Sequence, residues 1–218
     1  TIVAAPLAPT TEAGPANLSE ILFLRALYEA GAADAFDVVA VKPYGFDTGP
    51  DDRRVDAQRL NFSRAILVRE LMLAQGDGAT AVWAGNWGWN SLPEGWAGQP
   101  SIWGQTTAET QAAQTVAALE RARREWPWMG LMFLENWKAG PTSTALPTAA
   151  AIDDPRWGFS IAGRPAAAAL ADDLRRHINN LPLHGVRNRS LVEGWRKWRR
   201  RHPGALAWAV TSLAILIT

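Results

Sequence analysis

Tryptophan is the residue type that gives this sequence its clearest binding chemistry. Twelve tryptophans occur among 218 residues, and five of them crowd the stretch 83–103. These five are Trp83, Trp87, Trp89, Trp96 and Trp103. A flat indole ring can stack on the apolar face of a sugar, while its N–H donates to a hydroxyl group. The alternative is packing in a core, which Trp83 fits best because it lies inside an apolar run.

Sulfur and imidazole chemistry have little support in the sequence. The chain has no cysteine, which excludes thiolate catalysis and disulfides. Its three histidines, His177, His184 and His202, stand near the C-terminal end at no metal-ligand spacing. No Gly-rich phosphate-binding turn follows any apolar run. We therefore expect neither a metal nor a cofactor.

Four short apolar runs must position any functional side chains. They are residues 2–7, 36–41, 81–85 and 129–134, and helical patterns follow over about 18–30, 61–74, 106–125 and 164–179. Runs that are apolar throughout are typical of parallel strands covered on both faces. The pattern predicts an α/β fold of successive βα units. A complete (β/α)₈ barrel takes about 250 residues, so four units indicate half a barrel, with a four-stranded doubly wound sheet as the alternative.

The order of several motifs resembles the retaining β-glycosidases, particularly bacterial cellulase-like and β-xylosidase-like proteins, over about residues 1–176. The motifs are FDVVAVKPY (36–44), NFSR (61–64), VWAGNWGW (82–89), WPWMG (126–130), GFS (158–160) and RPA (164–166). The resemblance implies a TIM-barrel type of (β/α)₈ fold in which the four runs are strands five to eight. Strands one to four would then precede Thr1.

The resemblance also implies where the catalytic groups should stand. Retaining glycosidases use two carboxyl groups about 5 to 5.5 Å apart, one as acid/base and one as nucleophile. The acid/base would follow strand four, before Thr1, and the nucleophile position falls on Asn86. An amide cannot attack an anomeric carbon. Lys42 likewise replaces the family's histidine, and two such changes favour a degenerate site over a working glycosidase.

Glu135, directly after the run 129–134, is the best-placed carboxylate to replace the missing nucleophile. Pairing with Lys42, Lys138 or a loop backbone is the favoured interpretation for Glu135, since buried carboxylates are often merely paired. Glu12, Asp47 and Glu94 are expected to be solvated loop residues. The predicted carbohydrate-binding side chains are Lys42, Tyr44, Trp87, Trp89 and Trp137.

The charge distribution favours a membrane partner over a nucleic-acid one, which is the alternative for the basic block 187–201. The net charge is +1, yet residues 187–201 hold seven Arg or Lys and one Glu, immediately before an apolar stretch. Two tryptophans three residues apart among cations suit a helix lying among lipid headgroups. The predicted membrane-contacting residues are Trp195, Arg196, Lys197, Trp198, Arg199, Arg200 and Arg201.

These patterns divide the chain into three parts. Residues 1–180 are the glycoside hydrolase-like half barrel, 181–202 a linker with the basic interfacial helix, and 203–218 the start of a transmembrane helix. A buried C-terminal helix is the alternative for 203–218, because about 20 apolar residues are needed to span a bilayer. The basic flank predicts a cytoplasmic side, whereas the resemblance implies an extracytoplasmic one.

The function expected from the sequence is that of a membrane-anchored, catalytically degenerate glycoside hydrolase-like domain. It would bind carbohydrate or serve as an accessory or structural subunit of a membrane assembly. An active O-glycosidase that uses an N-terminal acid/base is the alternative. Open strand edges need a partner, which would be the N-terminal half or another subunit.

Overall fold

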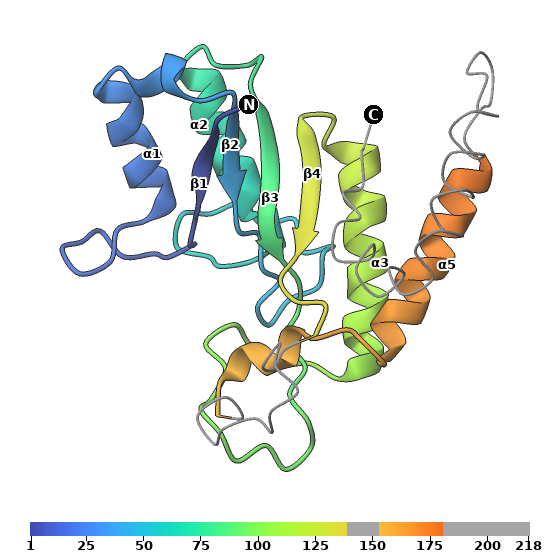
Figure 1. The fold of residues 1–218 in the computed structure, drawn as a ribbon. Helices are drawn as coiled ribbons and strands as arrows, with labels where there is room; N and C mark the ends of the chain where they lie inside the picture. The colour runs from blue at the N-terminus through green and yellow to red at the C-terminus, as the bar shows by residue number, and fades with distance from the viewer. Residues whose placement is uncertain (139–152, 181–218) are drawn as a thin grey trace, which may run out of the picture.

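The computed structural model describes residues 1–138 and 153–180. Within them a four-stranded sheet forms from β1 (Val3–Leu7), β2 (Val38–Val41), β3 (Ala81–Trp87) and β4 (Met129–Leu134) (Figure 1). All neighbouring pairs are parallel and their order is β1-β2-β3-β4. The predicted α/β fold with a parallel sheet is confirmed. Its strand order lacks the reversal that defines a doubly wound sheet.

The helices stand where the apolar periodicity predicts them. They are α1 (Glu20–Glu29), α2 (Ala65–Ala74), α3 (Ala108–Glu125) and α5 (Pro165–Asn180), with 3₁₀ turns η1 (Ala32–Ala35), η2 (Phe62–Arg64) and η3 (Pro155–Phe159). The side chain of Ser19 caps α1 by accepting the N–H of Ile21, and Thr107 caps α3 by accepting that of Thr110. Each strand is thus followed by a helix with a defined start.

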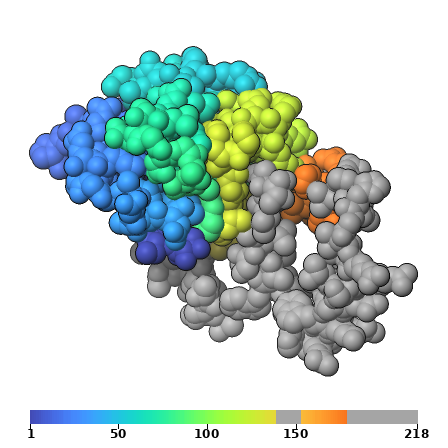
Figure 2. Space-filling view, turned by 90° about the horizontal axis from the view of Figure 1, so that it is seen from above, coloured from blue at the N-terminus to red at the C-terminus, as the bar shows by residue number. Residues whose placement is uncertain are grey.

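The core lies between one face of the sheet and the helices. Val39, Val82 and Met129 point into it from the strands and meet Met72 of α2 and Leu119 of α3. In the space-filling view the segments follow one another in chain order from blue to orange, as expected when each βα unit packs on the one before it (Figure 2).

On the opposite face the described residues leave apolar side chains uncovered. Val3 and Phe133 each keep 38% of their surface exposed. Trp83 also belongs to this face, because its ring lies beside Gly130 and 6.2 Å from the ring of Phe133. The structure therefore places Trp83 outside the core between sheet and helices, in contrast to the core position expected from its strand.

Two irregularities interrupt the pairing of β3 with β4. Val82 pairs with Met129, Ala84 with Met132, and Trp87 with Leu134. Strict alternation from Val82 and Ala84 would turn Asn86 toward the helices. The extra residue before Trp87 turns Trp87 to the core instead.

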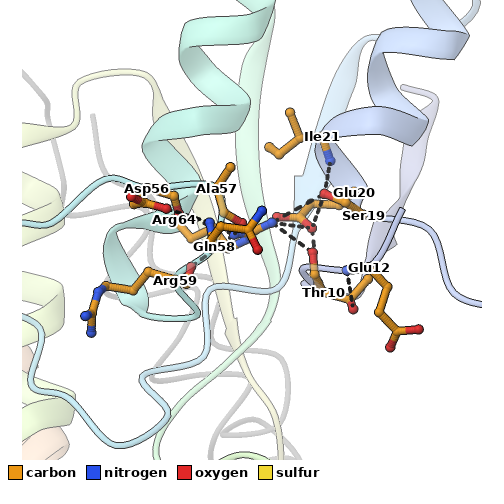
Figure 3. A network of polar contacts seen from close by, with 10 residues as sticks. All are labelled: Thr10, Glu12, Ser19, Glu20, Ile21, Asp56, Ala57, Gln58, Arg59 and Arg64. Carbon is orange, nitrogen blue, oxygen red and sulfur yellow. Dashed lines mark hydrogen bonds and ion pairs between the residues drawn. The ribbon is translucent and has the colours of Figure 1, made fainter. Parts of the chain in front are cut away.

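A buried ion pair joins the loops that follow β1 and β2 (Figure 3). Glu20 and Arg64 are each 3% exposed, and the Arg64 guanidinium donates to the Glu20 carboxylate through Nε and Nη2. Arg64 also donates to the carbonyl oxygens of Thr10 (2.9 Å), Ala57 (2.7 Å) and Arg59 (3.0 Å). One side chain therefore holds the start of α1 and two loops together.

The predicted interfacial segment 181–202 and transmembrane start 203–218 lie outside the described residues. Among the helices in 1–138 and 153–180, none combines the length and apolar character needed to cross a bilayer.

Replacing Arg64 with Met should leave the Glu20 carboxylate buried without its counter-charge. Breaking a buried pair in this way costs about 3–5 kcal/mol, and we expect that loss in the free energy of unfolding measured by urea titration. The matched control is Arg175→Met, which removes an ion pair to Asp172 from an arginine that is 72% exposed. The control should change stability by about 0.5 kcal/mol or less, and equal losses would contradict the central role of Arg64.

Candidate functional site

The loops after β2, β3 and β4 meet at the carboxyl edge of the sheet. Tyr44 forms a parallel bridge with Gly88, and the N–H of Gly45 donates to the Gly88 carbonyl at 3.1 Å. On the other side, the N–H of Glu135 donates to the Trp87 carbonyl at 2.9 Å. The pairing of the sheet thus continues past the strands and fixes Tyr44 and Glu135 on either side of β3.

Across this edge the hydroxyl of Tyr44 donates to Oε2 of Glu135 at 2.6 Å. Glu135 is paired, as the favoured interpretation held, but its partner is Tyr44 and not Lys42 or Lys138. Burial, followed by this hydrogen bond, raises the pKa of the Tyr44 phenol well above its ordinary value. The arrangement makes Glu135 a hydrogen-bond acceptor that holds a neutral phenol in place.

Asn86, at the predicted nucleophile position, lies near the end of β3 and is half-buried. It stands between Gly85, which packs closely against Pro6 and Ala40, and the buried Trp87. Its amide offers hydrogen-bond donors and an acceptor, but no charge and no nucleophilic oxygen.

Trp87 and Trp89 lie in the core and not at an open cleft. Each is 1% exposed, and their rings meet edge-on at 6.4 Å. Trp89 donates through Nε1 to the Thr48 carbonyl at 2.7 Å. Its ring fills space that only Gly45 leaves open, because a Cβ there would lie 1.8 Å from Trp89 Nε1. These two rings have no face free for a sugar, unlike the binding role expected for them.

Trp137 is half-buried and packs against the edge of the core. Its carbonyl accepts the N–H groups of Ile161 (3.1 Å) and Ala162 (2.8 Å). The residue therefore ties the end of β4 to the turn that precedes α5.

A pocket of about 530 Å³ opens over the carboxyl ends of β1 and β2. Tyr44 and Lys42, both predicted binding residues, line it, and Asn86 and Glu135 are not part of its described lining. Phe23, Phe46 and Trp103 are its other aromatic residues, and the ring centres of Phe46 and Trp103 lie 6.3 and 6.1 Å from that of Tyr44. Phe159 backs this group at 5.2 Å from Tyr44.

Two loops are locked together at this pocket. Phe46 has a φ of 53°, a left-handed conformation that is uncommon for a bulky residue. Gly104, next to Trp103, approaches so closely that a Cβ would lie 2.6 Å from the Phe46 carbonyl carbon. Backbone held in such a conformation is concentrated at binding sites. The density of tryptophan in 83–103 was the only sequence signal for Trp103, and Phe46 had none.

In residues 1–138 and 153–180 no cluster of three or more His, Asp or Glu side chains could hold a metal ion.

Comparisons with known proteins find similarity among solved structures. No family model matches the sequence, and no curated protein matches it. Among solved structures, the chain is similar to a GH113 β-1,4-mannanase, with 16% sequence identity and a TM-score of 0.38. The match covers 65% of this chain and 40% of the mannanase chain, so the chain spans less than half of that protein's length.

Both tyrosines of the chain donate to carboxylates, because Tyr28 binds Asp77 at 2.6 Å much as Tyr44 binds Glu135. Burial and these bonds raise both phenol pKa values. We expect the folded protein to show no phenolate absorbance at 295 nm near pH 10, where free tyrosine ionises. The unfolded state does lose protons there, so the contribution of the two tyrosines to stability should be constant well below pH 10 and fall as the pH rises through and above 10. The matched Tyr28→Phe variant isolates Tyr44, and a titration near pH 10 in that folded variant would contradict the assignment.

Proposed function

We propose that residues 1–180 form half of a glycoside hydrolase-like (β/α)₈ barrel that binds carbohydrate without hydrolysing it. The aromatic-lined pocket at the carboxyl edge of the strands carries this proposal. Barrel proteins place their binding sites at that edge. A concave site with aromatic walls and a few polar groups also suits a sugar chain, whose rings present both apolar faces and hydroxyls.

The sheet supports the barrel interpretation through its topology. Four parallel strands in sequential order, with a core toward the helices, correspond to four consecutive units of a barrel. The outer edges of β1 and β4 and the uncovered face with Val3 and Phe133 would then belong to the barrel interior and its closing seams. We expect further βα units, from the same polypeptide or from another subunit, to complete them.

The site chemistry favours binding over catalysis. Asn86 supplies no carboxylate, and the nearest replacement predicted from the sequence, Glu135, accepts the hydrogen bond of Tyr44. A retaining glycosidase needs two carboxyl groups about 5 to 5.5 Å apart, one as nucleophile and one as acid/base. With Glu135 committed to holding Tyr44, its role becomes the positioning of an aromatic wall of the pocket.

Membrane attachment through residues 181–218 is a second part of the proposal and rests on the sequence alone. The cations and tryptophans of 195–201 would lie among headgroups, and the apolar 203–218 would enter the bilayer. Such an anchor would make the domain a carbohydrate-binding accessory of a membrane assembly.

The binding proposal predicts that Trp103→Ala weakens oligosaccharide binding by roughly three- to tenfold, because an aromatic contact is worth about 0.5–1.5 kcal/mol. Isothermal calorimetry with β-1,4-linked tetrasaccharides measures this effect. Trp96→Ala is the matched control, since Trp96 belongs to the same loop but its Nε1 bonds the neighbouring Gln99 carbonyl. Equal affinities for the wild type and Trp103→Ala would rule the pocket out.

Hydrolysis is tested separately with aryl β-glycosides. We expect no release of the aryl alcohol above the uncatalysed rate, and no change on Glu135→Gln. Turnover that disappears in Glu135→Gln would instead establish the active glycosidase.

The anchor predicts binding of the full chain to vesicles containing phosphatidylserine. Each basic residue near an anionic surface contributes about 1 kcal/mol, so replacing Arg199, Arg200 and Arg201 with Gln should weaken cosedimentation at least tenfold. Replacing the exposed Arg25, Arg175 and Arg176 with Gln changes the net charge equally and should have little effect. Equal losses from the two triple variants would contradict an anchor at 195–201.

A further inference from the structure

We propose that the pocket over β1 and β2 selects sugars that carry a carboxylate, with Lys42 as the group that recognises it. This inference rests on the proposed carbohydrate binding and specifies its ligand as a chain of uronic acid residues.

Lys42 lies in the lining of the pocket, where its charge could contact a bound ligand. It directly follows β2, is half-buried, and lines the pocket together with Tyr44 and Trp103. No carboxylate in residues 1–138 or 153–180 lies within ion-pair distance of its ammonium group. A lysine of this kind buries its aliphatic stem and keeps its ammonium group in water, where an anionic ligand can reach it.

Neighbouring cations on the same edge already have protein partners, which are carboxylates or, for Arg164, the carbonyl oxygen of Ser91 at 2.7 Å. Arg64 is bound to Glu20, Arg54 contacts Asp52 at 2.7 Å, and Arg156 contacts Asp154. The contrast singles out Lys42 as a charge available to a ligand.

One carboxylate, Glu12, also lines the pocket, and its position differs from that of Lys42. Glu12 is exposed and both of its oxygens accept from Asn17 Nδ2 at 3.1 Å. The Glu12 carboxylate is thus already held by Asn17, whereas no described carboxylate is paired with Lys42. We therefore expect the pocket to prefer a ligand with an anionic group, which Lys42 would bind.

The aromatic wall and the cation together match the two parts of a uronic acid residue. The apolar ring face can lie on Trp103 or Phe46 while the carboxylate, fixed to the ring, meets the ammonium group. A hydrogen bond to a charged group is worth about 1.5–3 kcal/mol, which corresponds to roughly a tenfold or greater preference over the neutral sugar. A neutral sugar of the same stereochemistry would keep the stacking and lose only this bond.

The test compares ligands that differ only in the oxidation of C6. The full chain is titrated calorimetrically with β-1,4-linked tetramannuronate against mannotetraose, and with tetraglucuronate against cellotetraose. We expect one acidic member to bind at least tenfold more tightly than its neutral counterpart. High salt should reduce that preference without abolishing the binding of the neutral sugar.

Variants assign the preference to Lys42. Lys42→Met keeps an apolar stem and should bring the ratio of acidic to neutral affinity down to about one. Lys42→Arg keeps the positive charge and should retain most of the preference for the acidic sugar. Lys138→Met, which removes an exposed lysine after β4, gives the same change in net charge and should have no effect.

The outcomes distinguish a failure of this inference from a failure of the proposed carbohydrate binding. Equal binding of acidic and neutral tetrasaccharides, sensitive to Trp103→Ala but not to Lys42→Met, would overturn the ligand class and leave carbohydrate binding intact. An acidic preference that survives in Lys42→Met would overturn the assignment to Lys42. If no tetrasaccharide binds the wild type, the proposed function itself fails. Should Lys42→Met fail to fold, Lys42→Arg and the ligand pairs still decide the question.

Discussion

The ion pair between Arg64 and Glu20 is the interaction on which the carboxyl edge of this sheet depends. A guanidinium has five N–H donors in a fixed plane, and Arg64 distributes them between a carboxylate at the start of α1 and carbonyls of two loops. Neither charge could remain buried without the other. The loops after β1 and β2, which form much of the pocket wall, are therefore both held by Arg64. Their relative position depends on this ion pair, which is not part of the pocket lining.

Tyr44 connects the loop after β2 to β3 and to the loop after β4. Its backbone extends the sheet beside Gly88, its ring faces the pocket, and its hydroxyl reaches Glu135 after β4. A residue with these three contacts cannot move independently of β3 and β4. Glu135 thereby joins the loop after β4 to the loop after β2 through the hydroxyl of Tyr44.

The sequence was sufficient for the elements and insufficient for the directions of their side chains. Apolar runs and helical periodicity predicted the parallel α/β sheet, and the helical pattern over about 106–125 matches α3 (Ala108–Glu125). The burial of Trp87 was not predictable, because it depends on an irregularity that apolar composition does not encode. The partner of Glu135 is 91 residues away, and the space for the Trp89 ring depends on Gly45. Contacts of this kind are decided by tertiary packing, on which local patterns carry no information.

The two irregularities between β3 and β4 have a consequence for how this chain can vary. Val82 to Trp87 and Met129 to Leu134 span the same number of residues, because the extra residue in β4 comes before Ala84 and the one in β3 after it. The two offsets cancel, and the strands leave the sheet in step. Loss of one residue from either strand alone would rotate everything beyond it by one position and exchange inner for outer side chains. Insertions and deletions in these strands are therefore tolerated only as compensated pairs, so their lengths must evolve together.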